Sequence, residues 1–230
     1  MLSMARFRAA RSDDRGMSLT ELLVSMMIFG GLMAMIMTVM ITLTNMSKDS
    51  VARTQAIQEA RLGVAQIDRQ VRSGNVILDP GLEDPNNADV PKFFSLRIYT
   101  QEDGEYKCAQ WRVIDHDGDD FGDLEFRTWN PLVGPTSATT WSPVAHNLVD
   151  MAVTPTSQSQ IHADDPETWP PFWINLDNAD STEAQFISIT LRLKDPNEGD
   201  GKATTISTTV TGRNTVFGYP TSTCDDVPAP

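Results

Sequence analysis

The feature that most constrains this chain is a run without any charged side chain, from Leu22 to Ser47, close to the amino terminus. A helix needs about 20 consecutive apolar residues to cross the hydrocarbon core of a bilayer. The run LLVSMMIFGGLMAMIMTVMITLT is long enough, and a helix satisfies its own backbone polar groups. The sequence therefore predicts a membrane span, in which Gly30-Gly31 is either a weak point or a site of close packing.

The two sides of this run differ in charge. Residues 1–16 contain four arginines (Arg6, Arg8, Arg11 and Arg15) against only two acids, in a chain of 18 Lys+Arg and 31 Asp+Glu with a net charge of −13. Removal of residues 1–16 leaves 14 basic and 29 acidic side chains, a net charge of −15. A basic flank predicts that the amino terminus stays in the cytoplasm and that the acidic remainder is exported. An acidic surface also argues against nucleic acid as a direct partner.

A basic flank followed by an apolar run has three possible explanations, of which two are considered first. A secretory signal peptide has a shorter apolar region, followed by a small-x-small site, and that site is missing here. An ordinary single-pass anchor explains the length but not Glu21, an acid one turn inside the apolar segment. A carboxylate costs about 2.5 to 3.5 kcal/mol near the centre of a membrane helix and somewhat less near the interface, so Glu21 is expected to need a partner. The alternative is that Glu21 reaches the headgroups from a helix start, where an acid suits the helix dipole.

The junction Gly16-Met17-Ser18-Leu19-Thr20-Glu21-Leu22-Leu23-Val24 resembles the class III signal of type IV pilins and type II secretion pseudopilins. This resemblance implies that a prepilin peptidase cuts after Gly16 and that the new first residue, Met17, is N-methylated. It also implies that Glu21 pairs with the terminal amine of a neighbouring subunit, which relieves the desolvation of both charges. The implied partners are the peptidase, other pilin or pseudopilin subunits, a membrane assembly platform and membrane lipid. Two departures are Met17, where phenylalanine is commoner, and a span without a central proline.

The helical pattern continues beyond the span. Between Lys48 and Arg72, apolar residues recur every three or four positions, namely Ile57, Ala60, Val64, Ile67 and Val71. A single helix from Met17 to Arg72 would be about 84 Å long, so half of it is expected to project from the head. Gly74 and Asn75 supply the stop signal. An anchor joined to a separate short helix remains the alternative.

The rest of the chain favours short strands. After a loop over residues 75–92, strands are expected over residues 93–100, 105–114, 123–130, 147–154, 172–176, 185–194 and 204–211. The alternation is clearest in residues 185–194, which predicts a half-buried strand. The expected fold class is α+β, a long amino-terminal helix packed on an antiparallel sheet, as in the pilin fold. The predicted segments are a leader (1–16), a membrane or filament-core helix (17–47), an amphipathic helix (48–74) and an extracytoplasmic head with a carboxy-terminal tail (75–230).

Two cysteines, Cys108 and Cys224, make a disulfide plausible in an exported domain. The alternative is two unpaired thiols, one of them buried. The acidic turn with Asp115, Asp117 and Asp119 resembles a calcium loop only superficially, because Asp120 replaces the required glycine and Phe126 replaces the closing glutamate. It is therefore interpreted as a solvated hairpin turn.

No catalytic motif stands out, so the chain is expected to be neither an enzyme nor dependent on a cofactor. Within the pilin family, its length and the segment Cys108 to Val113 are more similar to a large minor pilin or a J-type pseudopilin than to a major subunit. The expected function is a structural subunit that primes or tips a type IV pilus or a type II secretion pseudopilus. The alternative is a single-pass, membrane-anchored extracytoplasmic enzyme or binding protein. In either case the expected location is the cytoplasmic membrane, with the head outside the cytoplasm and, for a subunit, later in a filament.

Overall fold

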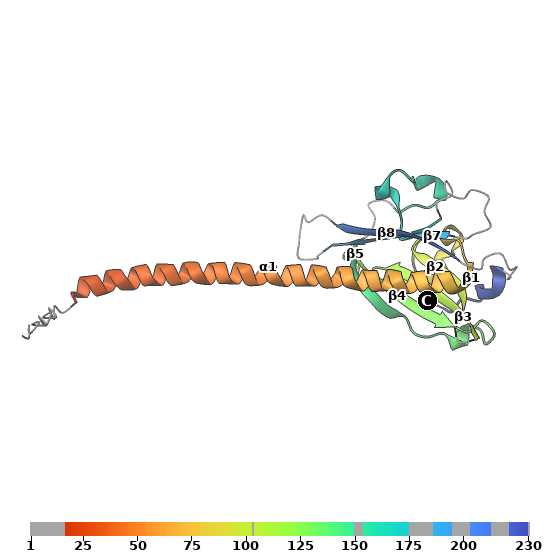
Figure 1. Ribbon diagram of the computed structural model, residues 1–230, viewed down its shortest axis with the longest axis horizontal. Helices are drawn as coiled ribbons and strands as arrows, with labels where there is room; N and C mark the ends of the chain where they lie inside the picture. Colours follow the sequence, from red (N-terminus) through yellow and green to blue (C-terminus); the bar gives the residue numbers. More distant parts are fainter. Residues whose placement is uncertain are drawn as a thin grey trace, which may run out of the picture. The chain divides into compact units, whose positions relative to one another are not determined.

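The computed structural model describes residues 17–102, 104–149, 154–174, 186–194, 203–212 and 221–229. One long helix, α1 (Leu19–Ser73), contains both the apolar run and the amphipathic segment (Figure 1). The chain divides into two compact units, Met1–Lys48 and Asp49–Pro230. The second unit carries all the strands that the structure describes, so its fold is described on its own.

The head contains one antiparallel sheet, which confirms the α+β class. Its strands are β1 (Gly74–Ile77), β2 (Ser95–Glu102), β3 (Glu105–Ile114), β4 (Phe121–Trp129), β5 (Ser142–Val149), β6 (Phe172–Trp173), β7 (Phe186–Leu193) and β8 (Thr204–Thr211). The strand order is β1-β2-β3-β4-β5-β7-β6, and β8 pairs with β7. The link between β5 and β7 is a single residue pair, Leu148 with Leu193, at which the sheet curls.

One stripe of α1 lies buried on the sheet. It consists of Ala56, Ala60, Gly63, Ile67 and Val71, spaced by four or three residues as expected of one helix face. Three of these residues are Ala or Gly, and a Cβ atom at Gly63 would meet Leu124 Cδ2 at 2.7 Å. Small side chains therefore allow this part of the helix to approach the sheet closely.

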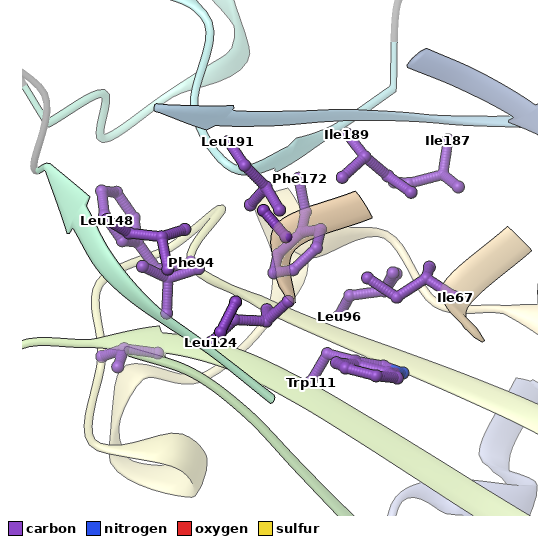
Figure 2. Packing of buried hydrophobic residues seen from close by; sticks show 14 of the residues in the cluster. Ile67, Phe94, Leu96, Trp111, Leu124, Leu148, Phe172, Ile187, Ile189 and Leu191 are labelled. Atoms are coloured by element: carbon purple, nitrogen blue, oxygen red, sulfur yellow. The ribbon is translucent and has the colours of Figure 1, made fainter. Parts of the chain in front are cut away.

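The main core lies between the helix and the curled sheet. Figure 2 shows Leu96, Trp111 and Leu124, from β2, β3 and β4, facing the apolar residues of β7 across the same interior. The residues contributed by β7 are Ile187, Ile189 and Leu191, all at most 1 % exposed. Ile67 of α1 and Phe172 of β6 also belong to this cluster.

Several expected strands agree with the structure and three expectations need correction. The strands expected over residues 105–114 and 204–211 are β3 and β8, with the same bounds. The expected loop over residues 75–92 is wrong at its start, because β1 pairs with β2 directly after the helix. The fifth strand begins at Ser142, earlier than expected, and part of the expected segment, residues 150–153, lies outside the described residues. Strand β7 is buried on both faces rather than half-buried, because Ser188 and Thr190 are also covered.

Candidate functional site

The amino-terminal end of α1 carries the residues that the sequence singled out. Met17 and Ser18 precede the helix, and the Ser18 carbonyl accepts the backbone N–H groups of Glu21 and Leu22 at 3.0 and 3.1 Å. Glu21 therefore lies in the first helical turn, where the helix dipole favours an acid. Gly16 lies outside the described residues.

The spacing of Ser18 and Glu21 is that of a capping box, S-x-x-E. The Ser18 hydroxyl, however, lies 2.9 Å from the Thr20 hydroxyl. Among the described residues, the exposed Glu21 carboxylate has no hydrogen-bond or ion-pair partner.

The helix around Glu21 is exposed along its whole apolar length. Every residue from Met17 to Gln55 is exposed, including Leu22, Phe29, Ile36 and Leu43 at 49 to 60 % of their surface. An apolar surface of this size is not stable in water and requires lipid or other protein surfaces around it. By length and composition, this is the one helix in the described residues that can cross a membrane.

Three threonines within this segment form hydrogen bonds with the helix itself. The hydroxyls of Thr38, Thr42 and Thr44 donate to the carbonyls four residues earlier, at 2.8 to 3.0 Å. These bonds leave no unpaired hydroxyl donor at the three threonines, as a hydrocarbon environment demands. The glycine pair lies in continuous helix, and a Cβ atom at Gly30 or Gly31 would meet nothing within 4 Å. It therefore leaves room for the close approach of another helix.

In the head, the two cysteines form a disulfide. Cys108 of β3 and Cys224 of the carboxy-terminal tail are joined with a Cα–Cα distance of 5.9 Å, across 116 residues of sequence. Both are buried, beside Val76, Tyr99 and Trp129. The disulfide fixes the tail on the sheet face opposite to the helix.

That opposite face carries a buried polar layer, which the sequence analysis missed. Arg97, Gln110 and Arg127 lie side by side on β2, β3 and β4. The Arg97 guanidinium donates to the Cys224 carbonyl at 2.6 Å. Arg127 donates to Gln110 and to the carbonyls of two tail residues, Pro228 and Ala229. The tail is therefore held through its backbone carbonyl groups, and no pattern of side chains in its sequence predicts these contacts.

Burial shifts the pKa values in this layer. Arg97 donates through Nε to both carboxylate oxygens of Glu83, at 2.7 and 2.9 Å, yet burial outweighs this partner and raises the pKa of Glu83. Burial lowers the pKa of Arg127 to about 10, and the neighbouring charge of Arg112 adds to this effect. The guanidinium carbons of Arg112 and Arg127 lie 4.0 and 4.2 Å from the centre of the Trp141 ring. These contacts give the arginines a structural role.

The acidic turn after β3 uses its first aspartate to organise the backbone. The Asp115 carboxylate accepts the N–H groups of Asp117, Gly118 and Asp120 at 2.7 to 3.1 Å. These bonds lower the pKa of Asp115. Asp119 accepts the N–H of Phe121 in the same way. In the described part of the chain, no three His, Cys, Asp or Glu side chains come together as a metal ion requires.

Two histidines form pairs with carboxylates near this turn. His116 Nε2 lies 3.0 Å from Glu125, which also pairs with Arg112 at 2.7 Å. His146 Nδ1 lies 2.8 Å from Asp123. Both rings are about half exposed, and the pairs link β4 to the turn after β3 and to β5.

Comparison of the chain with protein-family models, with curated proteins and with solved structures found no match. The candidate site therefore rests on the residues and on the geometry described above.

Proposed function

We propose that this chain is a pilin-like filament subunit. It is made as a precursor with its basic leader in the cytoplasm, cut after Gly16 by a prepilin peptidase, and assembled through its apolar helix. In this proposal the head adopts the pilin fold, and the large-minor-pilin or J-type subclass follows from the resemblance of its sequence. The partners are other pilin-like subunits, the assembly platform and, before assembly, membrane lipid.

The observation that carries the proposal is the position of Glu21. It lies in the first turn of α1, directly before the uncharged and exposed residues from Leu22 to Ser47, and it has no partner among the described residues. Cleavage after Gly16 would create a positively charged amine at Met17, four residues from this carboxylate. An amine from one subunit and a carboxylate from the next, facing each other in an apolar filament core, relieve each other's desolvation.

The difference between the first and second parts of α1 supports the same proposal. Its first part is apolar and exposed on all sides, whereas its second part buries a narrow stripe against the sheet. A plain anchor needs only to reach the membrane, and its helix has no need to continue into the head. A filament subunit uses one helix for both packing with neighbours and building its own core.

The test is a pair of variants in the native host. Gly16→Ala should abolish cleavage, because the peptidase recognises the glycine, and leave a larger precursor on an immunoblot. Glu21→Ala should still be cut. The amount of this variant recovered in the sheared filament or pseudopilus fraction should fall at least tenfold, which corresponds to about 1.4 kcal/mol. Matched controls are Ser12→Ala in the leader and Ser25→Ala in the span, which should behave as wild type. Normal cleavage and recovery of both test variants would contradict the proposal.

A further inference from the structure

An open cleft lies beside the last turns of α1, on a side of the helix that flanks its buried stripe. The helix contributes Gln66, Arg69, Gln70 and Ser73, which are spaced as neighbours on one helix face. Residues of β2, β3 and β4 line the other side. The cleft has a volume of about 440 Å³, within the range of about 300 to 1,000 Å³ for small-molecule sites. All its lining residues belong to the Asp49–Pro230 unit, so the cleft is a feature of the head alone.

Contacts with the core fix the two sides of this cleft relative to each other. The hydroxyls of Ser73 and Thr100 lie 3.1 Å apart and join the end of the helix to β2. The half-buried Phe126 ring packs on the fully buried Trp111, and Trp111 also donates its hydrogen bond to Gln70 on the helix. The helix side and the strand side of the cleft are therefore held by the same buried residue.

The cleft is lined by side-chain amides that can bind a ligand. Gln70 Oε1 accepts the Trp111 indole N–H at 2.7 Å, which fixes the orientation of this amide, and no described residue accepts a hydrogen bond from its Nε2 group. The side chains of Gln66 and Gln101, which also line the cleft, have no hydrogen-bond partner among the described residues. Together these amides offer both donors and acceptors, a combination that suits a ligand with several hydroxyl groups.

The cleft is basic in an acidic chain. Its charged lining residues are Arg69 and Lys107, and no acid is among the described residues that line it, in a chain of net charge −13. Lys107 has another interaction within the chain, so Arg69 is the cation assigned to a ligand. Arg69 is exposed and has no ion-pair partner among the described residues, because the preceding acid, Asp68, pairs with Arg72 at 2.9 Å. A guanidinium binds a carboxylate through two parallel hydrogen bonds.

We infer that this cleft binds a sugar acid, a sugar ring that carries one carboxylate. Arg69 pairs with the carboxylate, and the amides of Gln66, Gln70 and Gln101 form hydrogen bonds with the ring hydroxyls. The Phe126 ring contacts the apolar C–H groups of the sugar. A single assigned guanidinium matches a single negative charge, whereas a sugar phosphate carries about −1.5 to −2 at neutral pH. The site is formed by the folded head, so it does not depend on the proposed function.

The ligand class is tested by isothermal titration calorimetry on the full chain, in a detergent without sugar headgroups. The probe is D-glucuronate, which should bind with a Kd of about 1 mM or below, as expected of a small ligand. D-glucose lacks the carboxylate and acetate lacks the hydroxyl-bearing ring, so each should bind at least about tenfold more weakly. D-glucose 6-phosphate should also bind more weakly than D-glucuronate. Absence of D-glucuronate binding, or equal binding of any of the other three compounds, would overturn the inference.

The position of the site is tested by variants in the same titration. Arg69→Gln removes the charge and should weaken D-glucuronate binding by about tenfold or more, and Gln66→Ala should weaken it by about threefold. Both should keep the wild-type unfolding midpoint, because neither side chain has a partner among the described residues. The matched control is Arg61→Gln, an exposed arginine of the same helix that does not line the cleft. Wild-type affinity in either test variant, or an equal loss in Arg61→Gln, would overturn the inference.

Discussion

Trp111 Nε1 donates a hydrogen bond to Gln70 Oε1 at 2.7 Å, and this bond joins strand β3 to helix α1. Trp111 is fully buried and packs on Phe126, with ring centres 4.6 Å apart. A buried indole N–H needs an acceptor, and α1 supplies it from the last turns before the helix ends at Ser73. The end of the helix is thereby fixed in both position and rotation on the sheet.

Gln70→Ala should lower the free energy of unfolding of the head by about 1 to 3 kcal/mol, because it leaves the Trp111 N–H buried without an acceptor. All five tryptophans lie in the head, so urea unfolding of the full chain in detergent can be followed by their fluorescence. The control is Gln66→Ala on the same helix, whose side chain has no hydrogen bond among the described residues. Equal midpoints for the two variants would show that the bond does not stabilise the head.

Ile67→Ala should cost about 2 to 5 kcal/mol in the same measurement, because Ile67 is completely buried between the helix and the sheet and its loss leaves a cavity. Leu62→Ala is the matched control, since Leu62 is 69 % exposed. Its effect should stay within about 0.5 kcal/mol. A large loss at Leu62 would mean that this side of the helix is also packed in the head.

The buried face of α1 and the strands show what the sequence could and could not predict. Of the apolar residues expected on one helix face, Ala60, Ile67 and Val71 are buried, whereas Ile57 and Val64 are only half-buried. The strands expected over residues 105–114 and 204–211 have the bounds of β3 and β8. Strand β1 was missed because it has only four residues and follows the helix without a turn. The burial of β7 on both faces depends on segments distant in sequence, so alternation alone predicted a half-buried strand.

The buried polar layer could not be predicted from the sequence for a different reason. Arg97, Gln110 and Arg127 alternate with apolar residues, a pattern typical of a solvent-exposed strand face. They are buried because the carboxy-terminal tail lies on them and offers carbonyl oxygens as acceptors. Backbone acceptors are the same in every sequence, so only the folded structure reveals this contact. The exposed start of α1, in contrast, follows directly from its composition.

Removal of the disulfide should destabilise the head. The bond closes a loop with a sequence separation of 116, and loops of about that length are associated with up to about 4.7 kcal/mol in the chain-entropy model. The double variant Cys108→Ser/Cys224→Ser should therefore lose about 2 to 5 kcal/mol relative to the oxidised chain. Reduction of the wild-type chain should produce a similar loss and serves as the control. An unchanged unfolding midpoint after reduction would contradict the role assigned to the tail.

The Asp115 turn should give the head a dependence on acid pH. The pKa of Asp115 is lowered in the folded state, so its contribution to stability is fully present above its ordinary value of 3.8 and is lost as the pH falls through the lower, folded-state pKa. Asp115→Asn removes the charge and one acceptor oxygen, so it should be less stable than wild type at pH 7. The difference should shrink below pH 3.8. Asp117→Asn is the control. If the difference in stability between Asp115→Asn and wild type did not change with pH, this role of Asp115 would be contradicted.

The central claim is that the chain is a processed filament subunit, and the most direct test is mass spectrometry of the mature amino terminus. The protein is recovered from the membrane fraction of its host and its terminal peptide is sequenced. The account predicts a mature chain that begins at Met17, with a methyl group on its amine and without residues 1–16. A mature chain that retains the leader, or that begins beyond the apolar helix, would contradict the account.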